Sequence, residues 1–156
     1  MNTLPGVPQS TLRSQAIRLL ARREHSRAEL ARKLAALGTS EEIDAVLDQL
    51  ERSGLLSDAR TAAAYVRGHA MRFGSAKLNH SLRAKGISSE LIEASLSQDG
   101  IDDEPVRAAA VWRRKFADRP RDAREWARQA RFLQSRGFST EVIRKLLKEA
   151  PEGENE

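Results

Sequence analysis

Residues 82–92 read LRAKGISSELI, and residues 133–143 read LQSRGFSTEVI. These two stretches align without a gap at a spacing of 51 residues, and residues 34–43, LAALGTSEEI, form a weaker third copy. The third copy has one residue fewer between its glycine and its isoleucine. Self-similarity at a fixed spacing is typical of proteins built from repeated structural units. The sequence therefore predicts three repeats of about 50 residues.

Each copy contains the end of one helix and the start of the next. The glycine follows an apolar-periodic helix, at the C′ position where glycine adopts a left-handed conformation with little strain. The serine two residues later can cap the N-terminus of the following helix, and the glutamates behind it suit the helix dipole. We predict six structural turn residues, namely the glycines Gly38, Gly86 and Gly137 and the serines Ser40, Ser88 and Ser139.

Apolar residues at helical spacing predict three helices in each repeat. In the first repeat, Ser26 and Glu29 have the spacing of a capping box, and Leu30 and Leu34 follow on one face. No useful length of chain alternates with the period of a strand, so we predict an all-α fold. The expected segments are a flexible leader over 1–9, three-helix repeats over 10–56, 57–101 and 102–148, and an acidic disordered tail over 149–156. Because such small, aromatic-poor units bury little apolar area alone, we expect them to stack into an elongated, curved, solenoid-like molecule.

Composition narrows the class of protein further. The chain of 156 residues has no cysteine, which excludes disulfides and thiolate metal sites. Its apolar runs are far shorter than the roughly 20 residues that span a bilayer, and its N-terminus lacks the features of a secretory signal. We expect a cytoplasmic protein that does not bind membranes.

The charge pattern favours an anionic partner. The net charge is +5, and its sign alternates along the chain, with +6 for residues 59–86, −6 for 87–106 and +9 for 107–148. Apolar residues at helical spacing run through these blocks, which favours charged helices over disorder. Nucleic acid and an acidic protein surface both fit such a pattern.

The sequence shows little that could carry out catalysis. Neither a phosphate-binding glycine loop nor a helical zinc pair is present, and His25, His69 and His80 fall in different predicted segments without metal-ligand spacing. Residues 102–105, Asp-Asp-Glu-Pro, could hold Mg²⁺, but the start of a helix explains them better. We therefore expect no enzyme, no metal and no cofactor.

Basic residues on the leading and middle helices of the repeats form the first candidate binding feature. Residues 59–86 contain no acid at all. A solvated helix face is the alternative for any single cation, but such one-sided stretches favour a surface for an anion. The predicted partner-binding residues are Arg22, Arg23, Arg67, Arg72, Lys77, Arg83, Lys85, Arg113, Arg114, Lys115, Arg124, Arg128 and Arg131.

The turn between short helices is a second candidate, because it resembles the turn of DNA-binding helix-turn-helix modules. The third helix of the first two repeats is acidic and would be repelled by phosphates, so only the third repeat, with Arg144, Lys145 and Lys148, could dock in a groove. Aromatic residues could also stack on single-stranded bases, although core packing is the favoured role of Trp112, Trp126, Phe116 and Phe132.

Several short motifs occur in a fixed order along residues 11–148. They are Ser26-Arg27-Ala28-Glu29-Leu30 with Lys33-Leu34; Leu50 and Gly54-Leu55-Leu56 with Asp58, Arg60, Ala63 and Tyr65-Val66; Gly74, Lys77-Leu78 and Leu82 with Lys85-Gly86-Ile87; and Phe132-Leu133 with Arg136-Gly137-Phe138-Ser139. In order, spacing and repetition they resemble the RecX family of bacterial recombination regulators. Thr61, Ser57 and Gln129 depart from the family's usual aromatic, acidic and apolar residues, which concerns local packing.

The resemblance implies a nonenzymatic protein of recombination and SOS repair. Such a protein binds the RecA recombinase and its filament on single-stranded DNA, where it limits filament growth, ATP hydrolysis, strand exchange and coprotease activity. We expect it to act as a monomer, and direct contact with single- or double-stranded DNA remains open. Two alternatives are a stand-alone DNA-binding protein of helix-turn-helix-like type and a helical scaffold for an unrelated partner.

Overall fold

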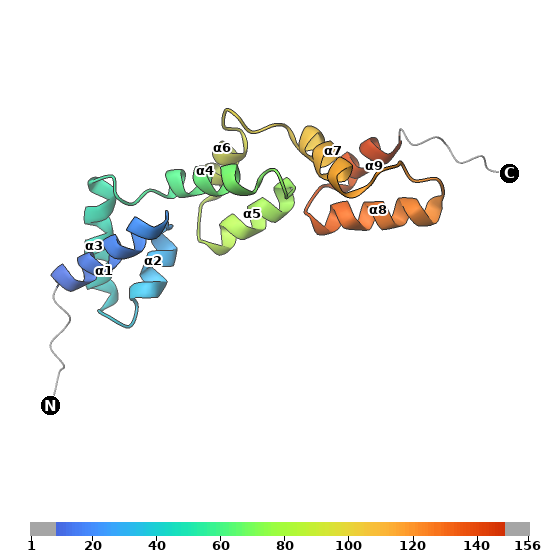
Figure 1. The fold of residues 1–156 in the computed structure, drawn as a ribbon. Coiled ribbons are helices and arrows are strands. Elements are labelled where there is room, and N and C mark those ends of the chain that lie inside the picture. Colours follow the sequence, from blue (N-terminus) through green and yellow to red (C-terminus); the bar gives the residue numbers. More distant parts are fainter. Residues whose placement is uncertain (1–8, 149–156) are drawn as a thin grey trace. The chain divides into compact units, whose positions relative to one another are not determined.

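The structure is a computed structural model that describes residues 9–148, and within that range the backbone forms helices and no strand (Figure 1). The helices are α1 (Gln9–Arg22), α2 (Arg27–Leu34), α3 (Ser40–Arg52), α4 (Asp58–His69), α5 (Ser75–Ala84), α6 (Ser89–Leu96), α7 (Glu104–Lys115), α8 (Ala123–Ser135) and α9 (Thr140–Lys148). The predicted all-α fold is confirmed. The predicted leader, apart from Gln9, and the predicted acidic tail lie outside the described residues. No helix in the described range is long and apolar enough to cross a membrane.

The chain forms two compact units. The first comprises the described residues up to Ala64 together with Leu82–Ser95, and the second comprises Tyr65–Ser81 together with the described residues from Leu96 onward. The division falls inside α4 and inside α5. The middle helix triplet therefore contributes residues to both units.

In the first unit, α1, α2 and α3 pack against one another around an aliphatic core. Ile43, Leu47 and Leu50 lie on one face of α3 at helical spacing and are 5%, 0% and 0% exposed. Burying each such side chain contributes about 1.5–3 kcal/mol. The buried members of this core are Leu12, Ala16, Leu30, Leu34, Ile43, Val46, Leu47, Leu50 and Leu56.

In the second unit, α7, α8 and α9 form a bundle of their own. Its buried core is smaller, with Trp112, Trp126 and Phe132 packed half-buried against it. The favoured packing role of these three rings is therefore confirmed. The buried members are Ala108, Val111, Leu133, Phe138, Ile143 and Leu147.

Gly86 and Gly137 end α5 and α8 as the sequence predicts. Their φ angles are +76° and +90°, in the left-handed region. In each turn the glycine N–H donates to the carbonyl three residues back, and the next N–H, of Ile87 or Phe138, donates five residues back at 3.2 Å. This is the Schellman pattern of helix ends, and the buried Ile87 and Phe138 complete it.

The prediction of a left-handed conformation for Gly38 is wrong. Gly38 is not among the residues with positive φ, and α2 ends instead in a tight turn in which Leu37 N–H donates to Leu34 O at 2.9 Å. The cause lies in the residue that this copy lacks. Where the other copies place an apolar residue after the glycine, this copy has Thr39, which already caps the next helix.

Ser88 and Ser139 cap α6 and α9 as predicted, because each hydroxyl accepts from the backbone N–H three residues on, at 3.4 and 3.2 Å. The predicted cap Ser40 is wrong, because Ser40 is the first residue of α3 and Thr39 is its cap. Thr39 forms a full capping box with Glu42. The shortened first copy moves the cap back by one residue.

Two of the departures from the family pattern are buried polar residues with partners. The Thr61 hydroxyl, 4% exposed, lies 2.9 Å from His25 O and 2.8 Å from Ser57 O. Gln129, 2% exposed, accepts from Trp112 Nε1 at 2.7 Å. Buried polar groups are tolerated when they are hydrogen-bonded, so the fold accommodates both departures.

Candidate functional site

In the second unit, the loop between α4 and α5 lies against the turn between α8 and α9. Gly74 N–H donates to Arg136 O at 2.7 Å, and Ala76 N–H donates to Gly137 O at 3.2 Å. A Cβ on Gly74 would lie 2.3 Å from Gly137 O, so only glycine fits there. This backbone pairing places Phe73 beside the end of α8.

Arg107 of α7 holds the same loop from within. Its side chain is 6% exposed, and it donates to Ala70 O at 3.1 Å, to Phe73 O at 2.5 Å and to Ser75 Oγ at 2.8 Å. Burial lowers the pKa of Arg107, and the carboxylates at the start of α7 oppose this effect. The guanidinium thus supplies donors to loop carbonyls that lie away from water and would otherwise lack a hydrogen-bond partner.

Cations surround the ring of Phe73 in this loop. Lys77 Nζ lies 4.4 Å from the ring centroid, and the guanidinium carbons of Arg72 and Arg136 lie at 5.5 and 5.8 Å. Arg136 also lies 5.1 Å from the ring of Phe132 on α8. Each such contact contributes about 0.5–1 kcal/mol at an exposed site. We call this set of residues, together with Arg114 and Lys115, the Phe73–Phe132 cluster.

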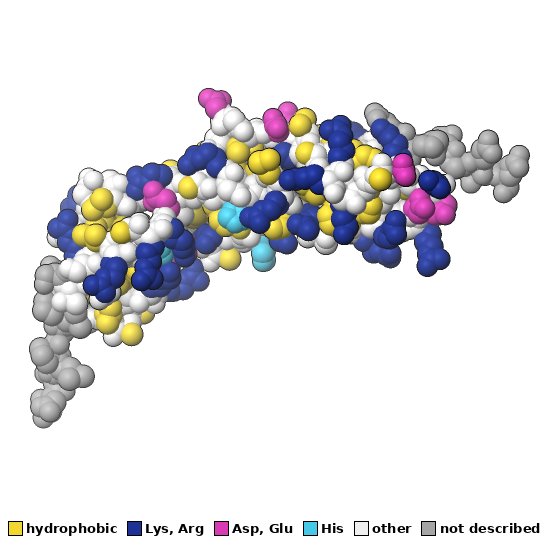
Figure 2. Space-filling view, in the orientation of Figure 1, with side chains coloured by type: hydrophobic (Ala, Val, Ile, Leu, Met, Phe, Trp, Pro, Cys, Tyr) yellow, Lys and Arg dark blue, Asp and Glu magenta, His cyan; other side chains and the backbone are white. Residues whose placement is uncertain are grey.

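A shallow pocket of about 200 Å³ opens within the cluster. Its lining holds four cations and no acid, namely Arg72, Val111, Arg114, Lys115, Phe132 and Arg136. On the face shown in Figure 2, Lys and Arg side chains far outnumber Asp and Glu. Like charges held this close raise the local positive potential, so the pocket attracts anionic groups.

An aromatic row continues from Phe73 along α4. The rings of Tyr65 and His69 stack with centroids 3.9 Å apart, and those of His69 and Phe73 stack at 6.3 Å. The three residues are half-buried, so part of each remains accessible. Flat rings beside cations are the elements with which proteins hold single-stranded nucleic acid.

Twelve of the thirteen predicted partner-binding residues are exposed, and Lys85 is half-buried. Four of them meet in the Phe73–Phe132 cluster, namely Arg72, Lys77, Arg114 and Lys115. The others of the second unit lie outside it, namely Arg67, Arg113, Arg124, Arg128 and Arg131. Arg22, Arg23, Arg83 and Lys85 belong to the first unit.

The sequence reasoning missed Phe73 and Arg136 as site residues. Phe73 precedes Gly74 in the α4–α5 loop, and Arg136 precedes Gly137 in the α8–α9 turn. These two glycines allow the backbone of the loop to contact the backbone of the turn. Phe73 is also the one phenylalanine outside the third repeat. These are weak signals, because their meaning depends on a contact between segments more than 60 residues apart in the chain.

In the first unit, Arg23 and Lys85 converge on Glu29, whose side chain is 10% exposed. The Oε2 atom of Glu29 lies 3.0 Å from the Arg23 guanidinium and 3.5 Å from Lys85 Nζ. Glu29 also completes the predicted capping box with Ser26. Burial alone would raise its pKa, but the Ser26 N–H, the Arg23 hydrogen bond and the two positive charges lower the pKa of Glu29 to about 2. These two cations therefore serve the fold of the first unit directly.

His25 is buried beside this group and is neutral. Lys33 Nζ donates to its Nε2 at 2.9 Å, so the proton is on Nδ1, which donates to Arg23 O at 3.0 Å. Burial is the largest cause that lowers the pKa of His25, and the charges of Arg23 and Lys33 act in the same direction. Within residues 9–148, no group of three metal-ligating side chains comes together.

The acidic helix α3 is partly neutralised from within the first unit. Arg27 of α2 pairs with Asp48 at 2.8 Å and with Glu51 at 3.1 Å. Although burial lowers it, the hydrogen bonds to these carboxylates raise the pKa of Arg27. The acidic residues of α3 thus form ion pairs with α2. An acidic helix of this kind is not suited to a DNA groove, because phosphates would repel it.

Together these features define the class: a helical repeat protein whose basic, ring-bearing surface suits an anionic partner. Three family models match in succession, the first three-helix domain of RecX over residues 13–50, the second over 57–96 and the third over 102–147. The chain belongs to the RecX family of regulatory proteins.

Relatives agree with this assignment over nearly the whole chain. The regulatory protein RecX of Leptothrix cholodnii is 49% identical over 143 residues, covering 90% of each chain, and that of Chromobacterium violaceum is 42% identical over 138 residues, covering 88% of this chain and 89% of the other. The crystal structure of RecX from Lactobacillus salivarius matches with a TM-score of 0.74 at 22% identity, covering 90% of this chain and 95% of that one. A second crystal structure of a regulatory protein RecX gives 0.75 at 23% identity, covering 90% and 72%. The two structures confirm the fold.

Proposed function

We propose that this chain binds the RecA recombinase and its filament on single-stranded DNA. In doing so it modulates recombination and SOS repair, mainly by inhibiting filament growth, ATP hydrolysis, strand exchange and coprotease activity. The proposal describes a cytoplasmic monomer that carries out no chemistry of its own. Family membership supports a regulatory role, and the resemblance of the motifs supports the choice of partner.

The observation that carries the proposal is the Phe73–Phe132 cluster. Its pocket combines four cations with an aromatic ring and has no acid in its lining. A filament of recombinase on DNA offers phosphates and acidic side chains together, and both suit such a surface. Arg72, Lys77, Arg114, Lys115 and Arg136 are therefore the proposed contacts. The other partner-binding residues named from the sequence stay predictions.

The proposal is tested by the ATP hydrolysis of cognate RecA on saturating single-stranded DNA at near-physiological salt. As this protein is titrated in, hydrolysis should fall at ratios well below one protein per recombinase. Simple competition for DNA would need far more protein, so the ratio separates filament binding from DNA masking. Unchanged hydrolysis up to equimolar protein would contradict the proposal.

A pair of matched variants tests the cluster itself. R72E/K115E reverses two charges of the cluster, and R13E/R18E reverses two exposed charges of α1. Losing two close ion pairs of about 0.5–1 kcal/mol each should raise the protein concentration for half inhibition by about fivefold to thirtyfold in the first variant. The second should behave like the parent protein. Equal effects in both would mean that only net charge matters.

Stand-alone DNA binding is the second candidate, and α9 is the observation that favours it. Arg144, Lys145 and Lys148 are all exposed on this helix, which follows the Gly137 turn. This candidate predicts tight duplex binding without recombinase, and an affinity that falls steeply as salt rises. Weak duplex binding at near-physiological salt would exclude it.

A further inference from the structure

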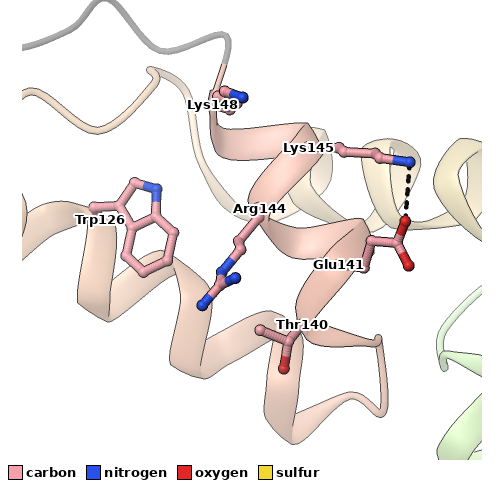
Figure 3. Close-up of a pocket in the computed structure, with 6 residues that line it drawn as sticks. All are labelled: Trp126, Thr140, Glu141, Arg144, Lys145 and Lys148. Carbon is pink, nitrogen blue, oxygen red and sulfur yellow. Dashed lines mark ion pairs between the residues drawn. The ribbon is translucent and has the colours of Figure 1, made fainter.

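A groove runs between α8 and α9 in the second unit (Figure 3). It encloses about 650 Å³ and is lined by Trp126, Thr140, Glu141, Arg144, Lys145 and Lys148. Its exposed lining is almost entirely carbon, although four of its six residues carry a charged group at the end of a long apolar stem. A groove of this size and character suits a bulky apolar side chain.

The rim of the groove carries a positive charge that the described residues leave unbalanced. Lys145 Nζ pairs with Glu141 at 3.1 Å, so these two charges cancel. Arg144 and Lys148 have no ion pair among residues 9–148. In Figure 3 the Arg144 side chain extends towards α8 beside Trp126, whereas Lys145 turns towards Glu141. The free cations therefore flank the apolar floor.

We propose that this groove docks a segment of a partner protein that combines acidic residues with a bulky apolar side chain. The apolar side chain packs on Trp126, and the carboxylates pair with Arg144 and Lys148. Both halves of the groove, the carbon floor and the cationic rim, are then used by one ligand. The chemistry is that of an acidic, amphipathic peptide.

Two other occupants fit the groove less well. The chain's own residues 149–156, EAPEGENE, are acidic but contain no bulky apolar side chain to fill the floor. A nucleobase would stack on Trp126, but its polar edge atoms would lose water against a carbon lining that returns few hydrogen bonds. An acidic peptide with an apolar side chain suffers neither loss.

The groove shares no lining residue with the pocket of the Phe73–Phe132 cluster. The inference therefore goes beyond the proposed function and does not depend on it. The protein can lack inhibition of the filament and still bind the peptide in the groove, and it can inhibit the filament without binding the peptide. The two are distinguished because the following experiment uses neither recombinase nor DNA as its main probe.

The test uses the emission of Trp126 in the full chain carrying W112F, which leaves one tryptophan. Because Trp112 donates to Gln129, circular dichroism first confirms that this background keeps its helices. The probes are the blocked peptides EEFEEL and EEAEEA, which have the same charge, the peptide EAPEGENE, and oligothymidylate. We expect saturable binding of EEFEEL with a shift of emission to shorter wavelength. The other probes should bind at least about tenfold more weakly, because they lack the buried side chains.

Charge reversals in the same background locate the site. R144E/K148E should weaken EEFEEL binding about tenfold, since two close charge pairs become repulsions. The matched control is R13E/R18E, which reverses two exposed charges of α1 in the first unit and leaves the lining of the groove unchanged. It should bind like the parent.

Four results would overturn the inference. Equal binding of EEFEEL and EEAEEA would show that charge alone acts. Tighter binding of oligothymidylate would assign the groove to nucleic acid, and tighter binding of EAPEGENE would assign it to the chain's own C-terminal residues. An equal effect of the two charge reversals would place the peptide elsewhere.

Discussion

Replacing Gly137 by alanine should destabilise the second unit much more than the same change at Gly100. Both glycines have a positive φ, +90° and +86°, so both substitutions incur the cost of a left-handed alanine, about 1–2 kcal/mol. The surroundings differ. A Cβ on Gly137 would lie 2.4 Å from Lys77 Cβ and 2.7 Å from Lys77 N, whereas a Cβ on Gly100 would meet nothing within 4 Å.

The steric clash at Gly137 involves the backbone of Lys77, which the neighbouring hydrogen bonds hold in place. Moving Lys77 away would stretch the hydrogen bonds from Gly74 N–H and Ala76 N–H to the turn, each of which contributes about 1 kcal/mol. Overpacking of this kind costs about 1–3 kcal/mol. We therefore expect G137A to lower the free energy of unfolding by about 4 kcal/mol, and G100A by about 1–2 kcal/mol.

Urea unfolding followed by tryptophan fluorescence measures this difference. Both tryptophans, Trp112 and Trp126, belong to the second unit, so their emission reports on the unit that contains the substitutions. Circular dichroism at low temperature checks that each variant is folded before denaturant is added. If G137A and G100A lose the same stability, the close approach of the α4–α5 loop to the α8–α9 turn does not constrain the fold, and the reasoning fails.

Three further predictions concern single side chains. The pKa of Glu29 is lowered from 4.5 to about 2 in the folded state, so its charged form contributes about 3 kcal/mol to the free energy of unfolding. This contribution is present above pH 4.5 and is lost as the pH falls towards 2. Acid unfolding of E29Q, followed by circular dichroism, should lack this dependence on pH. R107K should lower the free energy of unfolding of the second unit by about 2–4 kcal/mol, because an ammonium group cannot reach all the acceptors of the guanidinium. Urea unfolding followed by tryptophan fluorescence measures this loss, and an unchanged midpoint would contradict the reasoning. T39A should cost about 1 kcal/mol in chemical unfolding and S40A a few tenths, because Thr39 is the cap of α3; the reverse order would restore Ser40 as the cap.

The turns were predictable from the sequence where local chemistry decides them. Gly86 and Gly137 each stand before a buried apolar residue and two positions before a capping serine, and that spacing alone specifies a Schellman turn followed by a new helix. Gly38 failed the same prediction because the first copy is one residue shorter. Thr39, the residue after Gly38, caps α3 and so cannot also take the place of the apolar residue that completes a Schellman turn at the end of α2. The first copy therefore has a helix cap but no left-handed glycine.

The candidate site was only half predictable. The exposed cations Lys77 and Lys115 follow from composition and helical spacing, because charged side chains on a helix seldom point inward. Phe73 and Arg136 could not be found that way. Their proximity depends on two glycines that let distant backbone segments hydrogen-bond, and helical periodicity carries no information about such a contact.

Because the compact units divide inside α4 and α5, the repeats seen in the sequence do not coincide with the compact units of the structure. Removing residues 57–101 as a module would take Tyr65–Ser81 from one unit and Leu82–Ser95 from the other. The array therefore lacks the free modularity of repeat proteins whose copies can be added or deleted one at a time. A deletion that spans the middle repeat would therefore remove packed residues from both compact units at once.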